Sequence, residues 1–401
     1  MYKDQNISFE KGVNVGIDAD SKSDNIRLYY LDWLRVIVFG LLIVFHCLRL
    51  FDFIPFHIKN AEQSELLTQF FIFSTSWRMP LVFLVSGAGT YFAMRSKKGR
   101  FIAERVKRLI IPFLFGIILL IPPQKYFEYV FQTNNYINYI SYLADYPKTI
   151  ASSNIGFSLG WSGYIGHHIW YLVYLFIQTI ILIPFFKWVN KLSDDSLNTN
   201  GYKLMALLFI PMIAINIALR PYFSSYLDWA DFFHFMVFFI LGFVLVKFRH
   251  HLTNSIKQLW KPILVIAVIT SLIQHYLALF TDNMVKWYMT PNYNLDYLGF
   301  VALRSINSLS WVLLIYIAAV KYFSRNSTLL PKLNEAVLPI YLIHQTIIII
   351  IGFYVIDWSL SIELKFMIIF SLSCLSMYIL YQPIKQIGLL RWIFGMKPKK
   401  I

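Results

Sequence analysis

Residues 31–49 read "LDWLRVIVFGLLIVFHCLR", an apolar run that carries Asp32, Arg35, His46 and Arg49 and is still long enough to cross a bilayer. About 20 apolar residues span the hydrocarbon core, and a charged residue at its centre costs roughly 2.5–3.5 kcal/mol on insertion scales. Residues of this kind are kept either because they lie near the headgroups or because they have a function.

The spacing of these four residues places them on one face of a helix. At 100° per residue, the eleven positions from Arg35 to His46 return to within about 20° of the same direction, roughly 16 Å further along the axis. Asp32 lies one turn before Arg35, close enough to pair with it. A polar stripe needs polar partners or water, so we expect it to line a hydrated interior. The alternative is an ion pair that stabilises the helix end and a hydrogen-bonded core histidine.

The composition identifies an integral membrane protein. The chain of 401 residues is 58% hydrophobic and 14% charged, against about 45–50% and 25% in soluble domains. Apolar stretches fall near 30–50, 67–93, 108–123, 165–186, 203–219, 231–248, 262–280, 298–323, 335–356 and 364–384. They predict an all-α polytopic bundle of about ten transmembrane helices. Pro112, Pro122 and Pro123 interrupt the third stretch, so its outer end is open.

The basic residues predict the topology. Most of the 36 Lys and Arg fall in segments that are cytoplasmic if both termini are inside, as the positive-inside rule requires. The net charge of +15 is therefore a sign of membrane topology, and nucleic acid is excluded as a partner.

The predicted organisation has three parts. Residues 1–26 form a disordered cytoplasmic tail without the pattern of a signal peptide, residues 27–390 the membrane domain, and residues 391–401 a basic cytoplasmic tail. The Tyr-rich segment 124–163 is expected to be a long extracytoplasmic loop. It is either functional or an interfacial flap over the bundle.

Further polar residues lie within the apolar stretches, mostly toward the outer side: Arg78, His168, His234, His275, Arg304 and His344. Together they predict a wet, basic chamber open to the outside, although any one could be a satisfied core residue. At the inner face, "MRSKKGRFIAERVKR" (94–108) places Arg105 and Arg108 one turn apart, where they could hold a phosphate. Topology alone is the other explanation. The histidines show no HExxH motif or carboxylate cluster, and no metal is expected.

Five segments carry a family likeness: "RLYYLDWLRVIVFGLLIVFH" (27–46), "SWRMPLVFLVSG" (76–87), "ERVKRLIIPF" (104–113), "GHHIWYLVYL" (166–175) and "YLIHQT" (341–346). In order and spacing the chain resembles the membrane acyltransferase-3 family, in the branch of the glucans biosynthesis protein C type. The likeness covers about residues 27–390. It implies O-acyl transfer, such as O-acetylation or succinylation, in a bacterial inner membrane. The donor would be cytoplasmic acyl-CoA and the acceptor an extracytoplasmic carbohydrate, with no further cofactor.

The resemblance also implies roles for individual residues. Arg35 and His46 match the family's essential Arg and His, Asp32 its acidic partner, Arg105 and Arg108 its cytoplasmic pair, Ser86 and Gly87 its "SG", and His344 its late histidine. Segment 124–163 has no confident match, which leaves the acceptor open.

The resulting hypothesis assigns His46 as general base, a role that suits an imidazole. Arg35 and Asp32 would position the thioester tail, and Arg105 and Arg108 the CoA phosphates. The candidates for orienting the acceptor or stabilising the oxyanion are Arg78, Ser86, His168 and His344. The alternatives are a secondary transporter or flippase whose pathway the stripe lines, and a regulatory scaffold.

Overall fold

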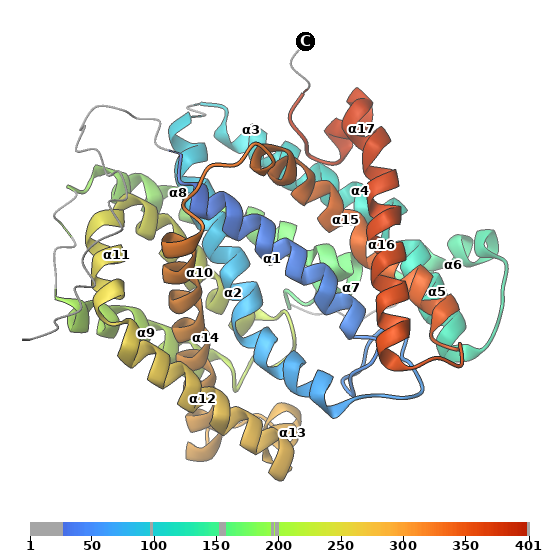
Figure 1. The fold of residues 1–401 in the computed structure, drawn as a ribbon, viewed down its shortest axis with the longest axis horizontal. Coiled ribbons are helices and arrows are strands. Elements are labelled where there is room, and N and C mark those ends of the chain that lie inside the picture. Colours follow the sequence, from blue (N-terminus) through green and yellow to red (C-terminus); the bar gives the residue numbers. More distant parts are fainter. Residues whose placement is uncertain (1–26, 97–98, 152–157, 194–195, 197–199, 399–401) are drawn as a thin grey trace, which may run out of the picture.

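The computed structural model describes residues 27–96, 99–151, 158–193, 196 and 200–398. The predicted tail 1–26 and residues 399–401 therefore lie outside the described residues. Within those ranges the chain forms helices and turns and no strand (Figure 1). The helices are α1 Tyr29–Leu48, α2 Glu65–Ser96, α3 Phe101–Arg105, the π-helical η1 Val106–Ile110, α4 Ile111–Leu119, α5 Ile121–Thr133, α6 Tyr139–Ala151, α7 Trp161–Gly166, the 3₁₀ turn η2 His167–Ile169, α8 Trp170–Lys191, α9 Gly201–Leu219, α10 Trp229–Lys247, α11 Arg249–Gln258, α12 Trp260–Phe280, α13 Asn283–Met289, α14 Leu295–Tyr322, α15 Leu330–Val355, α16 Ile362–Gln386 and α17 Gly388–Ile393.

Ten helical segments of the described chain are long and apolar enough to span a membrane, which confirms the predicted fold class. The third differs from its prediction, because it continues from Phe101 to Thr133 through α3, η1, α4 and α5, with only a turn at Leu120 between α4 and α5. Its prolines begin helices instead of ending them. Pro112 lies in the first turn of α4, and Pro122 and Pro123 in the first turn of α5, where the missing N–H is not needed.

The segment expected to be a loop, 124–163, is consequently mostly helical in its described part. Residues 124–133 belong to α5 and residues 139–151 form α6, and α7 starts at Trp161. Residues 152–157 lie outside the described residues. Most of the described residues of this segment therefore belong to helices of the bundle and do not form a loop.

Helices α2 and α10 cross so closely that their backbones touch at two glycines. A Cβ on Gly87 would overlap the carbonyl oxygen of Phe239, and a Cβ on Gly242 would overlap that of Leu84. Glycine at both positions lets the two backbones touch, as is common where membrane helices cross closely. Gly87 of the predicted "SG" pair therefore has a packing role.

Contacts far apart in sequence show which ends of the helices meet. The indole of Trp33, at the start of α1, donates to the carbonyl of Arg325 at 3.1 Å. Arg391 bonds Glu335 at 2.7 Å and is only 6% exposed, so the start of the predicted tail 391–401 packs on the bundle. The beginning of α1 and the end of the described chain thus lie at one end, the upper end in Figure 1. At the opposite end, Lys365 donates to Asn60 at 2.8 Å.

Candidate functional site

Three histidines from three elements meet toward the end of α1. The ring of His46 in α1 lies 5.0 Å from that of His344 in α15, and His344 lies 5.1 Å from His168 in η2 (centroid distances). Phe56, from the connection between α1 and α2, stacks on His46 at 6.0 Å. The structure thus brings together three of the residues singled out in the sequence.

Backbone carbonyls orient two of these imidazoles. His344 Nδ1 lies 2.5 Å from the carbonyl oxygen of Tyr341, and His168 Nε2 lies 3.0 Å from that of Leu342. A carbonyl only accepts, so those ring nitrogens carry the hydrogen. The opposite nitrogens, His344 Nε2 and His168 Nδ1, are buried without a hydrogen-bond partner among the described residues, as is His46 Nδ1. The cluster therefore offers unpaired ring nitrogens to whatever enters it.

Arg78 supplies a positive charge to the same region. Its guanidinium lies 3.1 Å from the ring centroid of Phe45, the residue before His46. The side chain is buried, and its Nε and Nη1 have no acceptor in the part of the chain that the structure describes. Unpaired buried donors are costly. Arg78 is therefore suited to an anion or to negative charge that develops during a reaction.

A second basic group lies at the opposite end of α1. Arg35 lies within electrostatic reach of Arg105 and Arg108, and its Nη2 is 2.8 Å from the position that a Cβ on Gly89 would occupy. Arg105 donates to Thr90 Oγ1 at 2.5 Å and keeps a buried Nε without a partner among the described residues. The exposed Arg108 donates to the carbonyl of Gly395 at 3.4 Å.

The expected pairing of Asp32 with Arg35 is wrong. Asp32 instead pairs with Arg27 at 2.7 Å, across the start of the helix. Arg27 is half-exposed, so its pair with Asp32 stays partly hydrated, whereas Arg35 extends into the bundle toward Gly89. Asp32 therefore forms its ion pair at the N-terminal end of α1, and Arg35 faces the other arginines.

Aromatic rings separate the arginine group from the histidines. Phe39 contacts Tyr171 and Tyr341 at centroid distances of 6.4 and 5.4 Å. Ser86, one of the predicted site residues, hydrogen-bonds the hydroxyl of Tyr171, and Tyr341 donates to the carbonyl of His168 at 2.5 Å. These three rings, Phe39, Tyr171 and Tyr341, lie between the two groups, and we call them the aromatic collar.

The structure adds a histidine and carboxylate that the sequence analysis did not select. His57 Nδ1 pairs with Glu128 of α5, and its Nε2 lies 2.9 Å from the amide nitrogen of Gln345, the neighbour of His344. His167 lies 5.3 Å from His57 (centroid distance). The available signal was the Pro122-Pro123 pair, which favours a helix start and would place Gln124 and Glu128 on one helical face.

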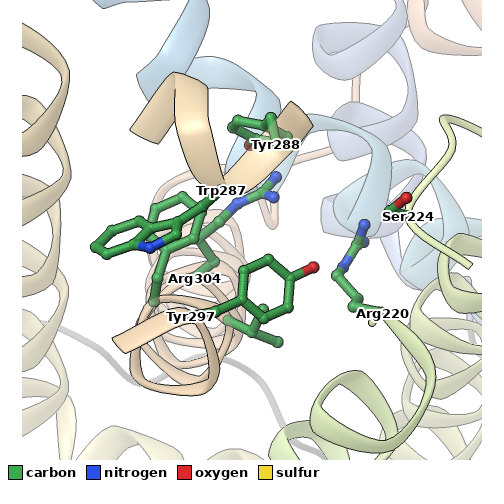
Figure 2. A pocket seen from close by; sticks show the side chains of 8 residues that line it. Arg220, Ser224, Trp287, Tyr288, Tyr297 and Arg304 are labelled. Carbon is green, nitrogen blue, oxygen red and sulfur yellow. The ribbon is translucent and has the colours of Figure 1, made fainter. Parts of the chain in front are cut away.

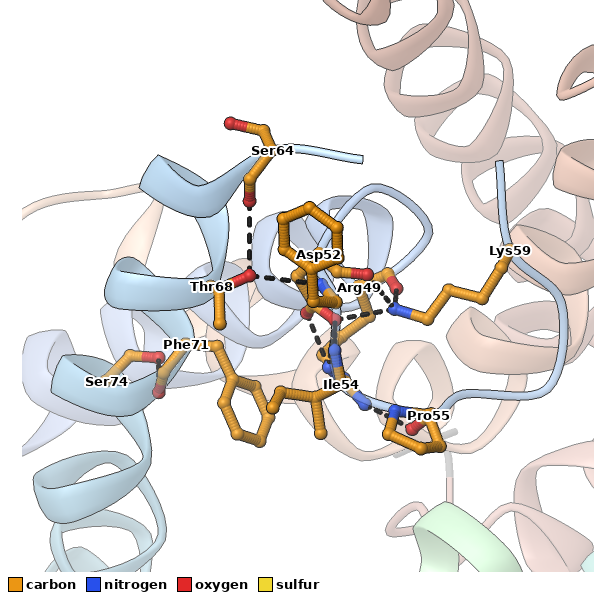
Figure 3. A network of polar contacts seen from close by, with 10 residues as sticks. Arg49, Asp52, Ile54, Pro55, Lys59, Ser64, Thr68, Phe71 and Ser74 are labelled. Carbon is orange, nitrogen blue, oxygen red and sulfur yellow. Dashed lines mark hydrogen bonds and ion pairs between the residues drawn. The ribbon is translucent and has the colours of Figure 1, made fainter. Parts of the chain in front are cut away.

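Arg49 does not extend the polar stripe into a cavity; it fixes the connection after α1 (Figure 3). Its guanidinium bonds Asp52 and the carbonyl of Pro55 at 2.6 Å. Lys59 bonds Asp52 at 2.5 Å. Burial lowers the pKa of Lys59 to about 8, although the carboxylate of Asp52 opposes that shift. The network holds the segment that places Phe56 over His46.

The remaining sequence candidates lie apart from the cluster and have partners of their own. His234 bonds Asn216 at 3.0 Å, and His275 bonds Gln69 at 2.6 Å. Arg304 lies over Tyr288 in a different pocket. The basic chamber expected from the sequence therefore contains fewer of these residues than predicted. Among the described residues, no group of three His, Cys, Asp or Glu could hold a metal.

Comparison with known proteins places this arrangement in a family. A family model described as an acyltransferase domain matches residues 28–382, most of the chain. The chain belongs to this acyltransferase family. It is 26% identical over 391 residues to glucans biosynthesis protein C of Escherichia coli O139:H28 (strain E24377A / ETEC), covering 93% of this chain and 95% of that protein. It is 29% identical over 171 residues to the Salmonella paratyphi B protein of the same name, covering 42% of each.

No solved structure gives a significant match to the chain. The family confirms the resemblance seen in the sequence, and it favours a membrane acyltransferase over a transporter or flippase. The ten apolar helices agree with a multi-pass membrane protein.

Proposed function

We propose that this protein moves an acyl group from cytoplasmic acyl-CoA to a hydroxyl of an extracytoplasmic glycan. The observation that carries the proposal is the convergence of His46, His344 and Arg78, all with buried polar atoms that no described residue satisfies. Native proteins rarely leave such atoms unpaired, so a cluster of them favours a binding or reaction site. The glucan-related names of the relatives support a carbohydrate acceptor.

The proposed donor path starts at the end of the bundle where α1 begins. Arg105, Arg108 and Arg35 lie there together, and arginine forks suit the phosphates of CoA. The basic residues of the sequence favour the cytoplasm for this end, with both termini inside and the protein in the inner membrane. The pantetheine arm would pass the aromatic collar, so we expect Phe39 and Tyr171 to move when donor binds.

In the proposed reaction, His46 removes the proton from the acceptor hydroxyl as the alcohol oxygen attacks the thioester carbonyl. Arg78 stabilises the oxyanion of the tetrahedral intermediate through its unpartnered N–H groups. The intermediate then collapses: the C–S bond breaks, and the departing thiolate takes the proton from His46. His344 and His168, held by backbone carbonyls, orient the acceptor.

The experiment that tests the proposal uses purified protein in proteoliposomes, with isotope-labelled acyl-CoA on one side and a glucan on the other. We expect the glucan to gain the mass of the labelled acyl group as free CoA appears on the donor side. Transport of unmodified glucan without CoA release would refute the acyltransferase proposal and support the transporter alternative. Parallel reactions with acetyl-CoA and succinyl-CoA would identify the acyl group.

A further inference from the structure

An open pocket lies between α5, the connection that follows it and the end of α15. Its volume is about 250 Å³, slightly below the roughly 300 Å³ at which small-molecule sites begin. The pocket around Arg220 and Arg304 (Figure 2) has only about 10 Å³, which is enough for about one water. The larger pocket therefore has space for a single ring of a longer molecule. Five aromatic rings and a carboxylate line it: Tyr126, Phe127, Tyr136, Phe353, Tyr354 and Asp357.

The aromatic rings of the pocket pack on one another and leave two tyrosines open. Phe353 meets Phe127 at a centroid distance of 5.0 Å and Tyr354 at 5.3 Å, both edge to face. Tyr136 and Tyr354 nevertheless remain 75% and 61% exposed. Aromatic faces carry partial negative charge and attract the C–H groups of a pyranose. The two tyrosines thus offer faces on which a sugar ring can lie.

The polar groups of the pocket also suit a sugar. The exposed carboxylate of Asp357 and the hydroxyls of Tyr136 and Tyr354 form no hydrogen bond or ion pair among the described residues. A carboxylate accepts several hydrogen bonds from hydroxyl groups. No Lys, Arg or His of the described chain lines the pocket, so an acidic ligand would meet Asp357 without a counter-charge. A quaternary ammonium also suits rings and a carboxylate, but it has no hydrogen-bonding group for the two tyrosines.

The pocket lies at the end of the bundle opposite the arginines of the proposed donor site. Asp357 follows the end of α15, and Lys365, which marks that opposite end, donates to the neighbouring carbonyl of Ile356 at 2.6 Å. Phe353 comes nine residues after His344 in α15, roughly 14 Å further along the helix axis. A sugar ring in the pocket is therefore on the acceptor side of the proposed reaction but distant from the histidines.

We propose that this pocket binds a neutral pyranose residue of the acceptor glycan, with the sugar face on the open tyrosines and its hydroxyls on Asp357. The assignment to the acceptor rests on the proposed function. Because of the distance from His344, the sugar held here is a different residue from the one that is acylated. The acceptor is thus anchored at one sugar and modified at another.

The test is saturation-transfer NMR with methyl glucoside and its acidic counterpart methyl glucuronide, on the protein in phosphatidylcholine nanodiscs. We expect the glucoside to bind at least about tenfold more tightly, because the acid would be held against the carboxylate of Asp357. Asp357→Asn should remove that preference. Asp282→Asn is the matched control, because Asp282 is an exposed carboxylate outside the lining, and it should leave the preference unchanged.

A second variant tests the rings. Replacing Tyr136 and Tyr354 together by alanine should weaken glucoside binding at least about tenfold. The same change at Tyr202 and Tyr378, which are 76% and 64% exposed and lie outside the lining, should not. All these side chains are exposed, so we expect the variants to fold.

Three results would overturn the proposal. The first is equal binding of the two sugars, or a preference that survives Asp357→Asn. The second is the absence of glucoside binding, which would identify the rings as anchors at the membrane interface. The third is displacement of the glucoside by tetramethylammonium, which would identify a site for quaternary ammonium groups.

The binding assay requires no turnover, so its failure and that of the acyltransferase proposal are distinguishable. In an active enzyme, the double tyrosine variant should raise the KM for a neutral glucan at least about tenfold. Normal turnover by a protein that does not bind the glucoside would refute only the pocket assignment. Glucoside binding without acyl transfer would refute only the acyltransferase proposal.

Discussion

Replacing Arg78 by methionine should make the protein more stable and almost inactive. The Arg78 side chain is 7% exposed, and two of its donors, Nε and Nη1, have no acceptor among the described residues. Each unsatisfied donor costs about 1–3 kcal/mol, whereas the loss of the contact with the Phe45 ring costs up to about 2 kcal/mol. Methionine keeps the stem of the side chain as far as the position of Nε and removes the charged guanidinium group. We therefore expect a gain of about 2 kcal/mol.

The same substitution should lower kcat by about 10²–10³, the usual cost of removing an oxyanion donor. Thermal unfolding in detergent and acceptor-dependent release of CoA measure the two effects. Arg49→Met is the matched control, because Arg49 is equally buried but paired with Asp52. Removing one partner of a buried ion pair costs about 3–5 kcal/mol, and Lys59 remains beside Asp52, so we expect a loss of about 3 kcal/mol. An Arg78→Met protein that is less stable than wild type and fully active would refute the reasoning.

Two further predictions concern the helix crossing and the donor end. Gly87→Ala should abolish folding or cost several kcal/mol, because its Cβ would overlap the backbone of α10. Gly40→Ala is the control: Gly40 has open space around it, so the change should be neutral or stabilising by up to about 1 kcal/mol. The yield of monodisperse protein tests both variants, and equal yields would contradict the close crossing of α2 and α10. The double change Arg105→Glu and Arg108→Glu should raise the KM for acyl-CoA at least about tenfold, because two charge-assisted hydrogen bonds are lost. The control Lys107→Glu, at an exposed position, should leave the KM unchanged. An unchanged KM in the double variant would show that the two arginines do not belong to the donor site.

The sequence was sufficient for features that depend on local pattern. The ten spans follow from apolar length, and the phase of α1 correctly placed His46 on an inward face. It could not give partners set by tertiary contact. Asp32 pairs with Arg27 although Arg35 is better spaced on the helix, because Arg35 reaches into the bundle.

The third span shows a different limit. Its prolines were interpreted as breaks, whereas the same residues are well suited to the first turn of a helix. With that turn assigned to a loop, Glu128 and its contact with His57 could not be foreseen. That contact joins two segments distant in sequence, and only the folded chain brings them together. His234 and His275 are histidines within apolar helices, as His46 is, but each forms a hydrogen bond with a side-chain amide.

The central claim is that the chemistry occurs at the histidine cluster near the end of α1. The most direct measurement compares acceptor-dependent CoA release by His46→Gln and His275→Gln in the same proteoliposomes. The account predicts a fall of at least about 10² for His46→Gln, as expected for loss of a general base, and near wild-type rates for His275→Gln. Wild-type turnover by His46→Gln would contradict the account.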